Sequence, residues 1–158
     1  MTDPLRQPEP RLSRPAFFAH VPEAEAALRA LSRAVAGSGL DLGLIELVKL
    51  RLSQVNGCGF CTAYHLAEAR RLGVAADRLD ALPVWREMPG FSPAERAALA
   101  YAEAVNAAGH GVPDALHEAA GAVLGEADLA RLTVAVALIG AWNRIAATWR
   151  FAPRPDGP

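Results

Sequence analysis

The chain has two cysteines, Cys58 and Cys61, and they lie three positions apart in the segment NGCGFC, with His65 four positions further on. On an α-helix, at about 100° per residue, the three side chains fall within about 60° of one another. Two residues three apart on a helix have Cα atoms roughly 5 Å apart, which a disulfide bond tolerates. The spacing therefore predicts a thiol pair that cycles between dithiol and disulfide without unfolding its helix.

The predicted position of this pair at a helix start favours a reactive thiol. Unpaired N–H groups in the first turn stabilise a thiolate, and this argument favours Cys58, the cysteine nearer the start. His65 lies one turn beyond Cys61 and can exchange a proton with it. Gly57 and Gly59 leave room for a small substrate. These residues favour thiol-dependent redox chemistry.

Glu46 is a candidate partner for His65. If the chain folds back at Asn56–Gly57, Glu46 lies about ten residues before the turn and His65 about eight after it, at nearly the same height for a rise of about 1.5 Å per residue. A carboxylate there would orient the imidazole and raise its basicity, which completes an acid–base relay. Glu46 could equally pair with Lys49 or Arg51 at the surface, and the spacing leaves both interpretations open.

Two other interpretations of the cysteines compete with redox chemistry. They could be inert core residues, because free cysteine is often buried. They could bind zinc with His65, but the fourth ligand would have to come from His20, His110 or His117. A CxxC motif without a second ligand pair is a poor structural zinc site. No βαβ pattern surrounds the motif, which argues against a thioredoxin fold.

Composition and net charge indicate the fold class of the chain and limit its binding partners. The chain has 158 residues, 52% hydrophobic and 21% charged, which predicts one globular domain. Its net charge of −1 removes the main sequence argument for binding nucleic acid or an anionic membrane. Its 34 alanines outnumber 18 residues of Val, Ile and Thr, which favours an all-α fold. The start, MTDPLRQPEP, has no apolar run, so neither a signal peptide nor an anchor is expected, and the protein is predicted to be cytoplasmic.

The secondary structure is predicted from the hydrophobic periodicity, the helix-capping residues and the positions of the prolines. Prolines cluster at both ends, which predicts extended or disordered tails over 1–22 and 151–158 around a helical domain of residues 23–150. About six to seven helices are expected in that domain, over 23–36, 41–55, 58–73, 75–82, 93–108, 113–125 and 126–150. The apolar run 132–142 is shorter than the about 20 residues of a membrane span, so the last helix is predicted to be a central buried one.

The chain resembles the alkylhydroperoxidase D-like (AhpD-like) branch of the carboxymuconolactone decarboxylase superfamily. The spacing Glu-x11-Cys-x-x-Cys-x3-His, present as Glu46, Cys58, Cys61 and His65, is that family's active-site pattern. The resemblance covers roughly residues 38 to 150, and it continues through Trp85–Arg86, the stretch FSPAERAAL at 91–99 and Ala141–Trp142–Asn143–Arg144.

The resemblance implies an all-helical fold that assembles as trimers or hexamers, and a peroxidase activity on hydroperoxides. Cys61 would be the peroxidatic cysteine, Cys58 would resolve its sulfenic acid as a disulfide, and Glu46 and His65 would form the proton relay. No bound cofactor or metal is implied; the reductant would be an external dithiol, a lipoyl group on a carrier protein or a thioredoxin-like protein. Phe60 stands where some members carry a further histidine.

Two rival functions remain. The decarboxylase branch does not rely on a cysteine pair, so Cys58 and Cys61 argue against it. A redox sensor or scaffold would use the same disulfide once, without turnover. Separately, Arg144 follows the most apolar run in the chain and is expected to form a structural ion pair with Glu103 or Glu46. Wide apolar helix surfaces predict a homo-oligomer rather than a monomer.

Overall fold

The computed structural model describes residues 9–109 and 111–153. Within these residues the chain forms eight α-helices, one 3₁₀ turn and no strand, which confirms the all-α prediction and all seven expected helices. In chain order the elements are α1 (Arg14–His20), α2 (Pro22–Ala36), α3 (Leu42–Val55), α4 (Gly59–Arg71), α5 (Ala76–Ala81), η1 (Leu82–Val84), α6 (Pro93–Ala107), α7 (Asp114–Leu124) and α8 (Glu126–Trp149).

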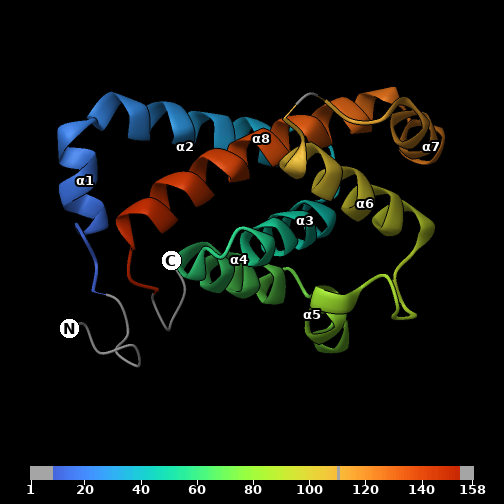
Figure 1. The fold of residues 1–158 in the computed structure, drawn as a ribbon, viewed down its shortest axis with the longest axis horizontal. Helices are drawn as coiled ribbons and strands as arrows, with labels where there is room; N and C mark the ends of the chain where they lie inside the picture. The colour runs from blue at the N-terminus through green and yellow to red at the C-terminus, as the bar shows by residue number, and fades with distance from the viewer. Residues whose placement is uncertain (1–8, 110, 154–158) are drawn as a thin grey trace.

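Helix α3 is the centre of the bundle and packs against α4, α6 and α8 (Figure 1). It is buried on almost every side because its sequence is apolar nearly all round, as expected of a core helix. Asp41 caps its start by accepting the Leu44 N–H (2.7 Å). The hairpin of α3 and α4 carries the cysteine pair at its turn.

Helix α8 crosses the whole molecule and contacts α2, α3, α4, α6 and α7. By length and composition alone it could span a membrane, since its best 18-residue window has a mean hydropathy of 1.3. Half of that window is buried inside the protein, however, and the helix lies at the junction of its neighbours (Figure 1). This agrees with the prediction of a central core helix.

The expectation of an extended N-terminal tail is wrong for residues 14–20, which form α1. Ser13 caps this helix by accepting the Ala16 N–H, and the nearby Pro15 is tolerated because first-turn N–H groups have no helical partner. Phe17 and Phe18 give α1 an apolar face that packs on the end of α8. Proline density alone did not reveal that face. Residues 1–8 of the predicted tail lie outside the described residues.

The C-terminal tail is likewise not free where it begins. Phe151 is 4% exposed and packs against the ring of Phe60 at the start of α4. Residues 154–158 lie outside the described residues.

The buried side chains form two clusters. The larger one joins α3, α6 and α8 into the main core. The smaller one, called here the terminal cluster, consists of Phe18, Cys58, Cys61, Ala146 and Phe151. The cysteines are therefore enclosed by side chains of α1, by the C-terminal half of α8 and by Phe151, and they are not part of the main core cluster.

Candidate functional site

The cysteine pair begins α4. Gly57 has a φ of +66°, a left-handed conformation that favours glycine, and it turns the chain out of α3. Cys58 is the N-cap residue of α4, and its Sγ accepts the Cys61 N–H (3.2 Å). The Cys58 N–H donates to the Ser53 carbonyl (3.0 Å). Cys58 thus stands just outside the helix, so the predicted helical projection holds for Cys61 and His65 only.

Cys58 and Cys61 are joined by a disulfide with a Cα–Cα distance of 5.3 Å, close to the separation predicted from helix geometry. Their residues are only 1% and 3% exposed. The bond closes within the first turn of one helix and links no second element. Opening it therefore removes no contact between helices, which is the property that a reversible thiol pair needs.

Glu46 lies opposite His65 across the α3–α4 hairpin, as the fold-back argument predicts. Its Oε2 accepts the proton of His65 Nδ1 (2.6 Å), and its Oε1 accepts a hydrogen bond from Lys49 Nζ (3.0 Å). All three side chains are buried. Both interpretations of Glu46 are therefore realised at once, although the Lys49 pair is buried and not on the surface. Arg51 instead pairs with Glu103 (2.6 Å).

The protonation state of Glu46 follows from its contacts. Burial by itself raises the pKa of Glu46, but the hydrogen bond from His65 and the charges of His65 and Lys49 outweigh it, so the pKa lies below its ordinary value. Glu46 is thus a carboxylate near neutral pH and can only accept hydrogen bonds. When the imidazole of His65 carries one proton, that proton is therefore at Nδ1, and Nε2 has a lone pair that can take a second proton.

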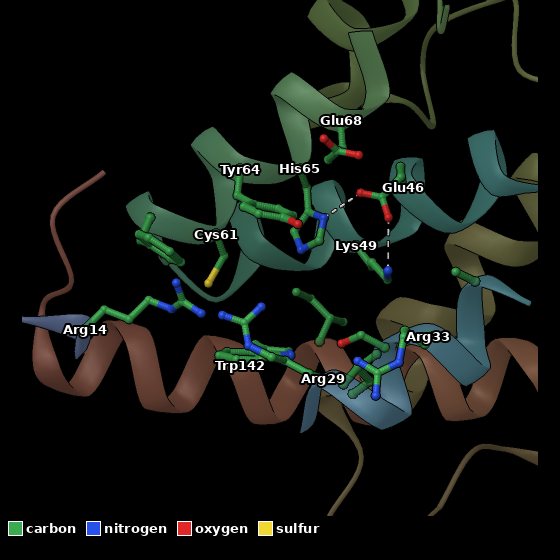
Figure 2. Close-up of a pocket in the computed structure, with 15 residues that line it drawn as sticks. Arg14, Arg29, Arg33, Glu46, Lys49, Cys61, Tyr64, His65, Glu68 and Trp142 are labelled. Carbon is green, nitrogen blue, oxygen red and sulfur yellow. Dashed lines mark hydrogen bonds and ion pairs between the residues drawn. The ribbon is translucent and has the colours of Figure 1, made fainter. Parts of the chain in front are cut away.

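Cys61 and His65 open into one cavity of about 410 Å³ between α4, α8 and the first two helices. Figure 2 shows the Cys61 sulfur and the free edge of the His65 ring directed into this space, with Trp142 on the opposite side. Burial, together with the charges of Glu68 and Glu46, raises the pKa of Tyr64, so its phenol is neutral here. The cavity combines a sulfur, a proton acceptor and space for a small molecule.

Comparison with known proteins identifies the family of this arrangement. The sequence profile of the Carboxymuconolactone decarboxylase family matches residues 22–104. The chain is also 31% identical over 133 residues to the uncharacterized protein YdfG of Bacillus subtilis, which covers 84% of this chain and 90% of YdfG. The chain belongs to the carboxymuconolactone decarboxylase family. The profile begins at α2, one helix before the N-terminal limit of the resemblance predicted from sequence.

Solved structures place this family member in the AhpD-like branch. One is an Agrobacterium tumefaciens protein of unknown function, ATU0492, provisionally described as the antioxidant defence protein AhpD; it is 36% identical, with a TM-score of 0.86 over 92% of this chain and 99% of that one. Another is a peroxidase-related protein with an alkylhydroperoxidase AhpD core from Ralstonia eutropha, 27% identical with a TM-score of 0.78 over 88% and 75% of the two chains.

Several residues of the cavity in this carboxymuconolactone decarboxylase family member were not expected from sequence, and those with polar or charged groups include Arg14, Arg29, Arg33 and Tyr64. Arg14 fell in the segment expected to be an extended tail. Arg29 and Arg33 share one face of α2 at a spacing of four residues, a pattern that surface arginines also show. Only the packing of α2 beside α8 turns that face toward Cys61.

The expected ion pair of Arg144 with Glu103 or Glu46 is wrong. Arg144 is exposed and donates to the Gly140 carbonyl one turn earlier (3.0 Å). Glu103 is instead held by Arg51 and Arg86, and Glu46 by Lys49 and His65. An exposed guanidinium needs no carboxylate because water solvates it.

The neighbouring Asn143 is the buried residue of this stretch. It donates to Ser53 Oγ (3.1 Å) and accepts from Asn56 (2.8 Å), and so ties α8 to the turn that precedes Cys58. Its contribution is to hold the turn in place.

The described residues show no arrangement suited to a metal ion. Within residues 9–109 and 111–153, no three or more His, Cys, Asp or Glu side chains lie close enough together to hold a metal ion. Of the candidate fourth zinc ligands, His20 and His117 are exposed, and His110 lies outside the described residues. The arrangement is suited to thiol chemistry assisted by an acid–base pair.

Proposed function

We propose that this protein is a thiol-dependent peroxidase that reduces organic hydroperoxides or hydrogen peroxide through Cys61 and Cys58. The observation that carries the proposal is that Cys61 shares a cavity with His65, whose Nδ1 is bound to the buried carboxylate of Glu46. A base oriented in this way takes the thiol proton and returns it to the leaving group.

In the first step the Cys61 thiolate attacks one peroxide oxygen. The S–O bond forms, the O–O bond breaks, and the alkoxide leaves as an alcohol with the proton that His65 took from the thiol. Cys61 is oxidised to a sulfenic acid, and the hydroperoxide is reduced. Glu46 stabilises the imidazolium while His65 holds that proton.

In the second step the Cys58 sulfur attacks the Cys61 sulfenic acid. The S–S bond forms, and the hydroxyl group leaves with a proton as water. An external dithiol, such as a lipoyl group on a carrier protein or a thioredoxin-like protein, then reduces this disulfide and becomes a disulfide itself. Cys58 lines a second cavity of about 360 Å³, together with Phe151 and Pro153. The disulfide thus lies between two cavities, with Cys61 in one and Cys58 in the other.

The placement of the two sulfurs supports Cys61 as the attacking cysteine. The helix-start argument favours Cys58, which is the N-cap residue, but only Cys61 lines the cavity that contains His65 and Glu46. Access to a base and to space for the substrate outweighs proximity to the helix start.

Stoichiometry tests the proposal. With excess dihydrolipoamide the reduced protein is expected to consume many equivalents of cumene hydroperoxide, and a Cys61→Ser variant none. Consumption that stops at one equivalent per chain would favour a redox sensor or scaffold. Hydroperoxide left intact, together with loss of carbon dioxide from a lactone acid, would favour the decarboxylase reaction.

We further propose that the protein works in the cytoplasm as a homo-oligomer, a trimer or hexamer. A reducing compartment would supply the dithiol. Large apolar side chains remain exposed on several helices, and a second copy would cover them; they include Val21, Leu31, Leu42, Val55, Val123 and Val134.

A further inference from the structure

The cavity above Cys61 has a cationic wall built by the first two helices. Arg14 reaches it from α1, and α2 contributes Arg29, Ser32, Arg33 and Ala36. The four α2 positions follow the i, i+3, i+4, i+7 pattern of one helix face. A whole face of α2, with two guanidinium groups on it, is therefore turned toward the site, as Figure 2 shows for Arg29 and Arg33.

The carboxylates of the cavity do not neutralise this wall. Glu46 is already bound by Lys49 and His65, and Glu68 is bound by Arg71 (2.7 Å). Each cavity carboxylate thus has its own cation, and neither contacts an arginine of α1 or α2 among the ion pairs of the described residues.

The two arginines of α2 are only partly balanced by carboxylates of the described residues. Arg14 and Arg29 both bind the same oxygen, Oε1 of Glu25 (2.9 and 2.8 Å). Arg33 has no carboxylate partner in the part of the chain that the structure describes. Arg33 therefore adds a positive charge that no carboxylate of the described residues balances. Because Arg29 and Arg33 are exposed, this charge lies on the solvent-facing side of the cavity, where it attracts an anion that enters from solution.

The opposite wall is apolar. Leu138, Ile139 and Trp142 of α8 line it together with Phe60. The site is thus suited to a molecule with an apolar body and an anionic group at one end, because such a molecule can satisfy both walls at once.

We propose, on the basis of the peroxidase function above, that the preferred substrate of Cys61 is an amphipathic organic hydroperoxide that bears a carboxylate. The carboxylate binds the guanidinium groups of Arg29 and Arg33, while the apolar body lies on Trp142 and its neighbours. Arginine suits this role because its planar donors match a carboxylate. The hydroperoxide end is then left to face Cys61 and His65.

A matched pair of hydroperoxides tests the charge requirement. Cumene hydroperoxide with a para-carboxylate is compared with its methyl ester, with dihydrolipoamide as reductant. The acid is expected to have a kcat/KM about fivefold higher than the ester at low salt, as for one partly exposed ion pair. Arg33→Gln and Arg29→Gln are each expected to reduce this acid-to-ester ratio toward one through KM. Arg70→Gln, which removes an exposed arginine of α4 outside the cavity, is expected to leave the ratio unchanged.

A second measurement does not depend on peroxidase activity. The reduced Cys58→Ser protein is alkylated with iodoacetate and with iodoacetamide, two reagents of similar size that differ in charge. The ratio of the two rates, divided by the same ratio for free cysteine, reports the preference for an anion at Cys61. The thiolate fraction cancels in that ratio. We expect a preference of about fivefold that Arg33→Gln reduces and that salt weakens, since the screening length is about 10 Å at 0.1 M.

The two measurements separate the two proposals. An ester reduced as fast as the acid, with no iodoacetate preference, would overturn the carboxylate inference and leave the peroxidase proposal standing. Failure to reduce either hydroperoxide would overturn the peroxidase proposal, while an iodoacetate preference lost in Arg33→Gln would still support an anion site. An acid preference that Arg33→Gln and Arg29→Gln leave unchanged would refute the assignment to these residues.

Discussion

The link between Glu46 and His65 gives the most specific prediction. In Glu46→Gln the amide oxygen can still accept the Nδ1 proton, but it no longer carries the charge that stabilises the imidazolium. A hydrogen bond to a charged group contributes about 1.5–3 kcal/mol and a neutral one about 0.5–1.5 kcal/mol. The difference of about 1–1.5 kcal/mol corresponds to a loss of about five- to twelvefold in the rate of peroxide attack. His65→Ala removes the base and is expected to lose about 10²–10⁴.

Glu46→Gln has a second effect that must be separated from the first. It leaves the buried Lys49 ammonium, now 3.0 Å from a neutral group, without its counter-charge. Breaking a buried pair in this way costs about 3–5 kcal/mol of stability. The double variant Glu46→Gln/Lys49→Met removes both charges and should recover most of that stability. The loss in rate should persist, because Lys49 is not bonded to the imidazole.

The assay is the rate of Cys61 alkylation by iodoacetamide against pH, in a Cys58→Ser background, beside the single-turnover rate with hydroperoxide. The reactivity of Cys61 is expected to move to higher pH in both the Glu46 and His65 variants, because the thiolate loses its cationic neighbour. Profiles that superimpose on the parent profile would refute the relay. A double variant that regains both stability and rate would show that Glu46 only supports the fold.

Three further predictions follow from the same geometry. Mass spectrometry of Cys58→Ser after one equivalent of hydroperoxide should trap Cys61 as a sulfenic acid; trapping on Cys58 in Cys61→Ser alone would reverse the roles. Because the pKa of Glu46 is lowered in the folded state, its contribution to the free energy of unfolding is present above the ordinary value of about 4.3 and is lost as pH falls further. The difference in free energy of unfolding between wild type and Glu46→Gln, measured by urea titration, should therefore decrease below that pH. A difference that does not change with pH would show that the lowered pKa of Glu46 does not contribute to stability. Light scattering should give a multiple of 16.7 kDa, and a mass near one chain would disprove the oligomer.

Local signals in the sequence predicted most of the helices. Asp41 and the Ser92–Glu95 capping box mark the starts of α3 and α6 where they were expected. The contact of Glu46 with His65 could be predicted because both residues flank one tight turn. The rise per residue then gives the position of each along its helix, measured from the turn. Cap residues and short-range geometry act over a few residues, which is why the sequence reveals them.

The remaining features depend on contacts between distant segments. Ser13 and Pro15 mark the start of α1 locally, but the surface that Phe17 and Phe18 pack on is the end of α8, which lies far away in the sequence. Arg33 lines the cavity because α2 packs on α8. Arg144 does not pair with Glu103, because Arg51 and Arg86 bind that carboxylate. Which partner a long side chain finds depends on the tertiary arrangement, not on its neighbours in sequence.

The terminal cluster has a consequence for the order of events on the ribosome. Phe151 is synthesised ninety residues after Cys61, yet it packs in the same small cluster as Phe18 of α1. Contacts between such distant residues form late, since a long loop must close first. The thiols of a growing chain therefore stay open to solvent at least until Phe151 has been synthesised. A nascent chain stalled before α8 would expose them to oxidation without the enclosure that the folded domain provides.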